Sequence, residues 1–95
     1  MSAKVFIIQT EYGFSVSPSP VVVPRSVATL EFENLSDVSA TITIPDTKPL
    51  PLNGGQKGAV KLPDSKSKLI RYKVKMTGTE LLARGNSAPI IIRDP

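Results

Sequence analysis

The chemistry open to this protein is limited first by two residue types that its sequence lacks. The 95 residues include no histidine and no cysteine. A serine–histidine triad and a thiol nucleophile are therefore excluded, as is a disulfide framework. A serine–lysine dyad remains, since Ser65 and Ser67 lie beside Lys66 and Lys68. Adjacent loop residues point apart and stay solvated, whereas catalytic groups are usually desolvated. The sequence predicts a protein that is not an enzyme.

The strongest chemical signal is a run of basic residues. In the segment "KLIRYKVKM" (68–76), apolar and basic residues alternate, so a strand there would carry Arg71, Lys73 and Lys75 on one face and Tyr72 on the other. Such a stripe could bind phosphates, but it offers no aromatic ring for base stacking. Lysines on a strand also protect against edge-to-edge association, and we favour this solvated-face interpretation. The candidate anion-binding residues are Lys66, Lys68, Arg71, Lys73 and Lys75.

Two other motifs point less strongly to chemistry. Glu31 and Glu33 share one face of a predicted strand, about 6.5 Å apart by strand rise, but no further carboxylate is fixed beside them. We interpret them as an exposed acidic face opposite a basic neighbour. The glycine-rich segment "NGGQKG" (53–58) lacks the Gly-Lys-Ser/Thr ending of a phosphate-binding loop, and no helical pattern follows it.

Composition indicates one globular domain over residues 1–95. The apolar content is 40%, and no window approaches the 18 apolar residues of a membrane helix. The start "MSAKVFIIQTEYG" has four consecutive apolar residues, too few for a signal peptide. We therefore expect either a cytoplasmic protein or a mature periplasmic or secreted domain. Net charge is −3 over residues 1–47 and +7 over residues 48–95, which raises the question of an anionic partner.

Short runs rich in Val, Ile, Thr and Phe, separated by nine prolines and six glycines, predict an all-β protein. About seven strands with turn signals between them are typical of a two-sheet Greek-key β-sandwich. The longest predicted loop is 46–58, and Thr79, Glu80 and Gly85 favour a short helical turn at 79–84. The predicted strands span 4–10, 12–23, 27–33, 39–45, 59–63, 68–76 and 88–94.

Alternation within these runs predicts which side chains build the core. The last run, "APIIIRD", has consecutive apolar residues and is expected to be buried on both faces. The predicted core consists of Phe6, Ile8, Val21, Val23, Leu30, Phe32, Ile42, Ile44, Ile70, Tyr72, Val74 and Ile91.

The segment "FSVSPSPVVVPRSVATLEFEN" (14–34) resembles the N-terminal half of the cupredoxin family. In that family an aromatic residue and a proline lead into an extended strand, a tight turn follows, and an alternating strand ends in Phe-x-Asn. Here these features fall on Phe14, Pro18, the turn at 25–26, and Phe32 with Asn34. The ending "GNSAPIIIRDP" resembles the family's terminal strand after a glycine.

The resemblance does not extend to the copper site. The turn is one residue longer than usual and lacks the family's glycine, with Ser26 nearby instead. The resemblance would place the first histidine ligand near Ala40 and the cysteine around 75–77, and the other two ligands would fall within 79–84. Two imidazoles and a thiolate are required for a blue-copper site, so no copper and no other cofactor is expected.

A second resemblance is to immunoglobulin-like sandwiches of the major-sperm-protein and periplasmic-chaperone type. Those domains share an aromatic-x-x-x-Pro start and an "N-x-S" turn between two strands, as in Asn34-Leu35-Ser36. The ending "GNSAPIII" favours the cupredoxin-like topology, with the immunoglobulin-like topology as the alternative. Asn34 begins a glycosylation sequon, which we interpret as a turn whose side chain bonds nearby backbone.

We expect a non-catalytic module that binds another protein or a ligand. The cupredoxin resemblance implies a surface at the end of the sandwich where relatives hold copper, formed by loops 34–39, 46–58 and 77–87. The alternative is binding of a polyanion or nucleic acid by the basic strand 66–75. Candidate interaction residues in the loops are Asp37, Lys48, Asn53, Lys57, Arg84 and Asn86.

Overall fold

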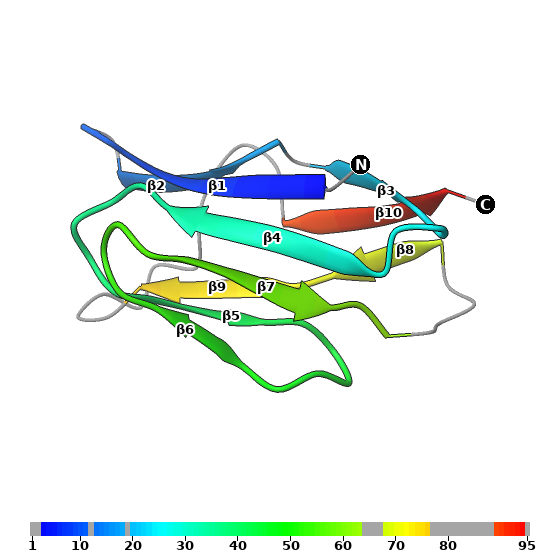
Figure 1. The fold of residues 1–95 in the computed structure, drawn as a ribbon. Coiled ribbons are helices and arrows are strands. Elements are labelled where there is room, and N and C mark those ends of the chain that lie inside the picture. Colours follow the sequence, from blue (N-terminus) through cyan, green and yellow to red (C-terminus); the bar gives the residue numbers. More distant parts are fainter. Residues whose placement is uncertain (1–2, 12, 19, 64–67, 77–88, 95) are drawn as a thin grey trace.

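The computed structural model describes residues 3–11, 13–18, 20–63, 68–76 and 89–94, and every regular element in these ranges is a β-strand (Figure 1). The all-β fold class is therefore confirmed. The strands are β1 (Ala3–Thr10), β2 (Gly13–Ser17), β3 (Val21–Pro24), β4 (Thr29–Asn34), β5 (Ala40–Thr43), β6 (Leu50–Leu52), β7 (Lys57–Lys61), β8 (Leu69–Arg71), β9 (Lys73–Met76) and β10 (Ile90–Asp94).

These strands form a sandwich of two layers. The first layer is a four-stranded sheet in the order β2-β1-β4-β7. The second layer contains two three-stranded sheets, β3-β10-β8 and β6-β5-β9. Because β8 and β9 are separated by Tyr72 alone, these two sheets continue one another across the same side of the molecule (Figure 1).

The described part of the chain holds ten strands rather than about seven. Two predicted strands are each divided into two, and the predicted loop 46–58 contains one further strand. The predicted strand 12–23 becomes β2, which pairs with β1, and β3, which pairs with β10 in the other layer. Pro18 and Pro20 lie at the crossing, where a missing N–H interrupts no ladder. The chain thus changes layers within the segment 12–23, for which the sequence predicts an irregular strand or a bend.

Strand pairing also explains the two other differences from the predicted strands. The predicted loop 46–58 contains β6, which pairs with β5, and the start of β7. The predicted strand 68–76 changes partner at Tyr72, since β8 pairs with β10 and β9 pairs with β5. The predicted helical turn at 79–84 lies outside the described residues.

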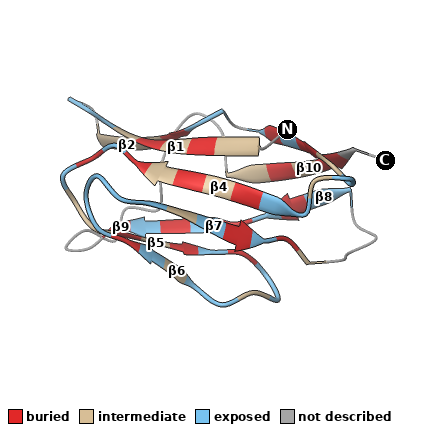
Figure 2. Ribbon diagram, in the orientation of Figure 1, coloured by how far each residue is buried: buried red, intermediate tan, exposed pale blue. Residues whose placement is uncertain are grey.

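The core lies between the layers and is lined by alternate residues of each strand (Figure 2). Ten of the twelve predicted core residues are buried, and the two exceptions, Phe6 and Ile8, are both in β1. The core also includes Val5, Ile7, Val16, Ala40, Leu52, Val60, Leu62 and Met76.

The inward face of β1 is the reverse of the predicted one. Val5 and Ile7 are fully buried, whereas Phe6 and Ile8 are half-buried on the outer face. The run 5–8 consists of four apolar residues and contains no polar residue that would mark the outer face. The sequence therefore does not show which alternate residues point into the core. The parallel register with β4 decides the matter, because it aligns Val5 with the inward Phe32.

The terminal strand β10 also has one buried face rather than two. Ile91 and Arg93 point inward with Val21 and Val23 of β3, while Ile90 and Ile92 are half-buried on the outer face. The guanidinium of Arg93 is buried and donates from Nη1 to the carbonyl oxygen of Val27 at 2.9 Å. The second layer therefore presents apolar side chains of its last strand on its outer surface.

Candidate functional site

Three basic residues of the segment 68–76, Arg71, Lys73 and Lys75, form an exposed row on the second layer, and Lys68 lies one residue out of phase with them. Lys68 precedes β8, Arg71 ends β8, and Lys73 and Lys75 lie in β9, all of them exposed. The alternate residues Ile70, Tyr72, Val74 and Met76 are buried, as the sequence pattern predicts. Lys66 lies outside the described residues.

The strands beside this row supply apolar neighbours at one end and threonines at the other. Leu69 is aligned with Ile92, and Ile92 in turn with Val22 of β3. Val22 is 54% exposed and Leu69 is 48% exposed, large values for apolar side chains on a sheet. Lys73 is aligned with Thr43, and Lys75 with Thr41. We call this surface the basic–apolar face, formed by Val22, Leu69, Arg71, Lys73, Lys75, Ile90 and Ile92.

The cations of the basic–apolar face have no acidic partner among the described residues. The ion pair that the described part of the chain contains joins Lys4 to Glu33, on the first layer. The strands aligned with β8 and β9 place isoleucines and threonines beside the row. Three positive charges and four apolar side chains thus share one surface, with no acidic partner among the side chains that the structure describes.

The aromatic ring nearest to this row points into the core. Tyr72 is 3% exposed and packs edge-on against Phe32, with ring centroids 5.7 Å apart. Its hydroxyl is buried and makes no hydrogen bond within the described part of the structure. Burial raises the pKa of the Tyr72 phenol well above its usual range, because the phenolate would lose its hydration. The ring is therefore inaccessible to a nucleic-acid base.

Replacing Tyr72 with phenylalanine is expected to stabilise the protein. The change removes a buried, unpaired hydroxyl and keeps the ring that packs on Phe32, so we expect Tyr72→Phe to raise the free energy of unfolding by about 1 kcal/mol at pH 7. Because folding raises this pKa, the wild type also loses stability above about pH 10, where the unfolded chain ionises first. Urea denaturation at pH 7 and at pH 11 measures both effects. A destabilised variant at pH 7 would show that the hydroxyl is bonded.

Asn34 organises the end of the sandwich where β4 stops. Its side chain is fully buried, and Nδ2 donates to the carbonyl oxygens of Val38 at 2.8 Å and Leu52 at 3.1 Å. Oδ1 accepts from the backbone N–H of Ser36 at 3.0 Å and from its hydroxyl at 2.6 Å. The asparagine is thus a turn former whose side chain bonds nearby backbone, as the sequence analysis proposed.

The β6–β7 turn packs tightly onto the loop that follows Asn34. A Cβ on Gly54 would lie 2.8 Å from the carbonyl oxygen of Ser36, so a glycine is required at this approach. The backbone N–H of Gly55 donates to the carbonyl oxygen of Asn34 at 2.8 Å, and the Ser39 hydroxyl donates to Asn53 Oδ1 at 3.1 Å. This end of the molecule is a cap held together by hydrogen bonds.

The predicted interaction loops do not all meet at this cap. Asp37 and Asn53 are exposed on it, and Lys57 begins β7 just after it. Lys48 lies away from the cap, beside the Ala59–Lys61 end of β7, because β6 occupies part of the predicted loop and separates Lys48 from Asn53. The expectation that 46–58 forms one loop at one end is therefore wrong. Arg84 and Asn86 lie outside the described residues.

The paired carboxylates of β4 lie on the outer face of the first layer. Glu33 Oε1 is 2.7 Å from Lys4 Nζ, and that ammonium lies 5.1 Å from the centroid of the Phe6 ring. The hydrogen bond from Lys4 holds the pKa of Glu33 below its usual value. Among the described residues no three His, Cys, Asp or Glu side chains gather as a metal-binding group. Glu33 is thus ion-paired with a basic neighbour on the outer face of the first layer, as the sequence interpretation of these carboxylates predicts.

No model of a known protein family matches this chain, and no curated protein matches its sequence. In the part of the chain that the structure describes, no helix has the length and apolarity needed to span a membrane.

Proposed function

We propose that this protein is a non-catalytic β-sandwich module that binds an acidic protein partner through its basic–apolar face. The observation that carries the proposal is that exposed Leu69 and Val22 share a face with the row Arg71, Lys73 and Lys75, which has no acidic partner among the described side chains. Contiguous exposed apolar residues bordered by charge are typical of protein interaction surfaces. Apolar contact would supply affinity, and the cations would steer and orient a partner of opposite charge.

The composition of this face favours a protein over a nucleic acid. Phosphate binding uses cations alone, and it gives no role to Val22, Leu69, Ile90 or Ile92. Single-stranded binders add aromatic stacking, but Tyr72 is turned into the core. An acidic protein surface with an apolar centre would use both halves of the face.

A matched pair of variants tests the proposal in affinity capture from the source cells. The face variant combines Leu69→Ser with Lys73→Gln and lowers the net charge by one. The control Ser17→Glu makes the same change of charge at an exposed position of the first layer. We expect specific partners to bind wild type and control alike, and to bind the face variant about tenfold less, as the loss of one buried contact would cause. If wild type, control and face variant captured the same partners in equal amounts, the proposal would be contradicted.

A second candidate function is polyanion binding by the same cations. It is favoured by the absence of acidic partners for Lys68, Arg71, Lys73 and Lys75 within the described residues. Retention on heparin or DNA would then fall steeply with salt, and replacing Lys73 and Lys75 with alanine would weaken it further. No retention at low salt would exclude this function.

We also propose that the topology is that of a Greek-key, cupredoxin-like sandwich without a copper site. Its support is that the residues carrying the resemblance fall on consecutive elements. Phe14 lies in β2, Pro18 marks the crossing to β3, and Asn34 ends β4 after the turn at 25–26. Ala40, at the place of a ligand histidine, is a buried core residue.

A further inference from the structure

A second, separate feature lies on the first layer, where β7 forms an edge. In the described part of the structure β7 pairs with β4 and with no other strand. The N–H of Leu62 donates to the carbonyl oxygen of Ala28, and the carbonyl oxygen of Gln56 accepts from Asn34, both at 2.8 Å. Antiparallel ladders alternate, so Gly58 and Val60 also face β4. The backbone groups of Lys57, Ala59 and Lys61 therefore point away from the sheet.

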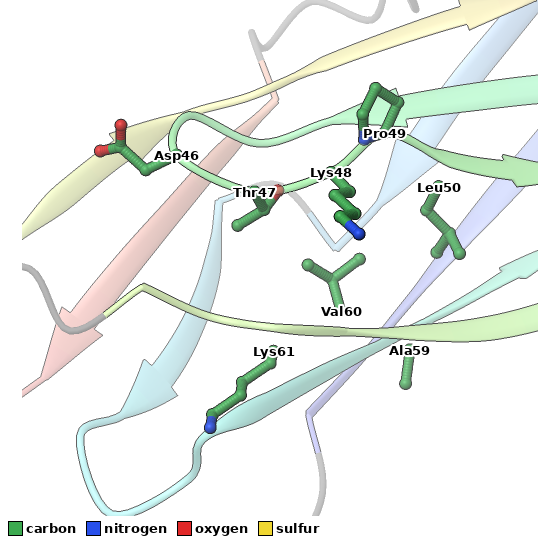
Figure 3. Close-up of a pocket in the computed structure, with 8 residues that line it drawn as sticks. All are labelled: Asp46, Thr47, Lys48, Pro49, Leu50, Ala59, Val60 and Lys61. Carbon is green, nitrogen blue, oxygen red and sulfur yellow. The ribbon is translucent and has the colours of Figure 1, made fainter.

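A groove of about 380 Å³ opens beside this edge, between β7 and the segment that leads into β6 (Figure 3). Val60 is buried and Leu50 is half-buried on its apolar side. Gly58 keeps the two strands close, since a Cβ there would lie 3.0 Å from Leu52 Cδ2. The groove is lined by Asp46, Thr47, Lys48, Pro49, Leu50, Ala59, Val60 and Lys61.

Three lysines border this edge, and Glu31 of β4 is aligned with Ala59 on the same outer face. Lys57 and Lys61 project from β7 on the outer face, and Lys48 reaches toward β7 from across the groove (Figure 3). The carboxylate of Asp46 projects away from the other lining side chains (Figure 3). Lys57 is aligned with Glu33, but that carboxylate is already paired with Lys4. Lys61 is aligned with the neutral Thr29.

We propose that the β7 edge binds an extended segment of a partner protein by antiparallel strand addition, with acidic and apolar residues alternating in that segment. Its acidic residues would lie beside Lys57 and Lys61, and its apolar residues would enter the groove against Leu50 and Val60. This site is on the opposite layer from the basic–apolar face and does not depend on it.

A second copy of this chain is a poor occupant of the same edge. Antiparallel pairing of two β7 strands about Ala59 would place Lys57 of one copy opposite Lys61 of the other. Like charges directly opposite one another destabilise a strand pair. The lysines that prevent self-pairing would attract an acidic strand, and this argues for a partner of different sequence.

The test uses a fluorescently labelled ten-residue peptide in which Glu and Val alternate. The fluorescence anisotropy of the peptide is measured as the 95-residue protein is added. In the proposed antiparallel pairing the Glu amides face β7, because their side chains share a face with Lys57 and Lys61. N-methylation of every Glu amide should therefore abolish binding, while N-methylation of every Val amide should spare it. Equal effects of the two modifications, or a wild-type protein that does not bind the parent peptide, would overturn the proposal.

Protein variants give an independent test. Ala59→Pro removes an edge N–H that β4 does not use, and we expect at least tenfold weaker peptide binding with the fold intact by circular dichroism. Lys57→Gln with Lys61→Gln should also weaken binding, whereas the charge-matched Lys73→Gln with Lys75→Gln should not. Equal affinity of the two double variants would contradict the proposal, as would a dimer in sedimentation that is lost in Ala59→Pro.

Discussion

Replacing Asn34 with alanine is expected to lower the free energy of unfolding by about 3 kcal/mol, a large fraction of the stability of a domain of this size. The carbonyl oxygen of Leu52 and the backbone N–H of Ser36 would lose their partners in a buried site. The end of β4, the loop 36–38 and the end of β6 would also no longer be joined by one side chain. Urea denaturation at neutral pH measures the change.

Asn53→Ala is the control for this prediction. Asn53 is exposed, and its bond to Ser39 is exposed as well, so its replacement should change stability by no more than about 0.5 kcal/mol. Asn34→Asp should destabilise more than Asn34→Ala, because it places a carboxylate oxygen against two carbonyl oxygens. If Asn34→Ala and Asn53→Ala had equal effects, the buried network would not hold the cap together.

The second large effect is expected in β1, where adjacent isoleucines occupy opposite faces. Ile7 is fully buried between the layers, so Ile7→Ala should cost about 4 kcal/mol through lost burial and an unfilled cavity. Ile8 is half-buried on the outer face, and Ile8→Ala should cost about 1 kcal/mol. The identical chemical change at two successive positions makes each variant the control for the other.

The comparison is made by chemical denaturation of the two variants under one set of conditions. It discriminates between the two ways in which the strand could face the core. A larger loss for Ile8→Ala than for Ile7→Ala would reverse the face of β1 and contradict the register with β4. Val5→Ala and Phe6→Ala extend the same test to the neighbouring pair.

The fold class and most of the core could be predicted because β4, β5 and β9 alternate between apolar and polar residues. In such strands one face is specified by residue type alone. In β1 four consecutive apolar residues, Val5 to Ile8, carry no such mark, and the inward face depends on pairing with β4. The same holds for Ile90 to Ile92 in β10, whose faces depend on the register with β3.

Strand boundaries were less predictable where a short strand lies among turn residues. The segment 46–58 contains three glycines and two prolines, which hide the alternation of Leu50 and Leu52 in β6. Pairing with β5 forms this strand, and Pro51 is tolerated because β6 lies at the edge of its sheet. Its presence separates Lys48 from Asn53 and divides the predicted loop.

The candidate surfaces were predictable to different degrees. Alternation alone placed Arg71, Lys73 and Lys75 on one exposed face. The apolar half of the basic–apolar face could not be predicted, because Val22 and Ile92 reach it through pairing between distant segments. The β7 edge was hidden for the same reason, since sequence does not show which strands end a sheet.

The central claim, that the basic–apolar face is the interaction surface, is tested most directly by site-specific photocrosslinking. A photoreactive residue at position 69 reports on this face, while the same residue at position 37 reports on the cap and at position 17 on the first layer. We expect a discrete crosslinked partner from position 69 in the source cells, and none from position 37 or 17. A crosslinked partner from position 37 with none from position 69 would contradict the claim and move the interaction surface to the cap.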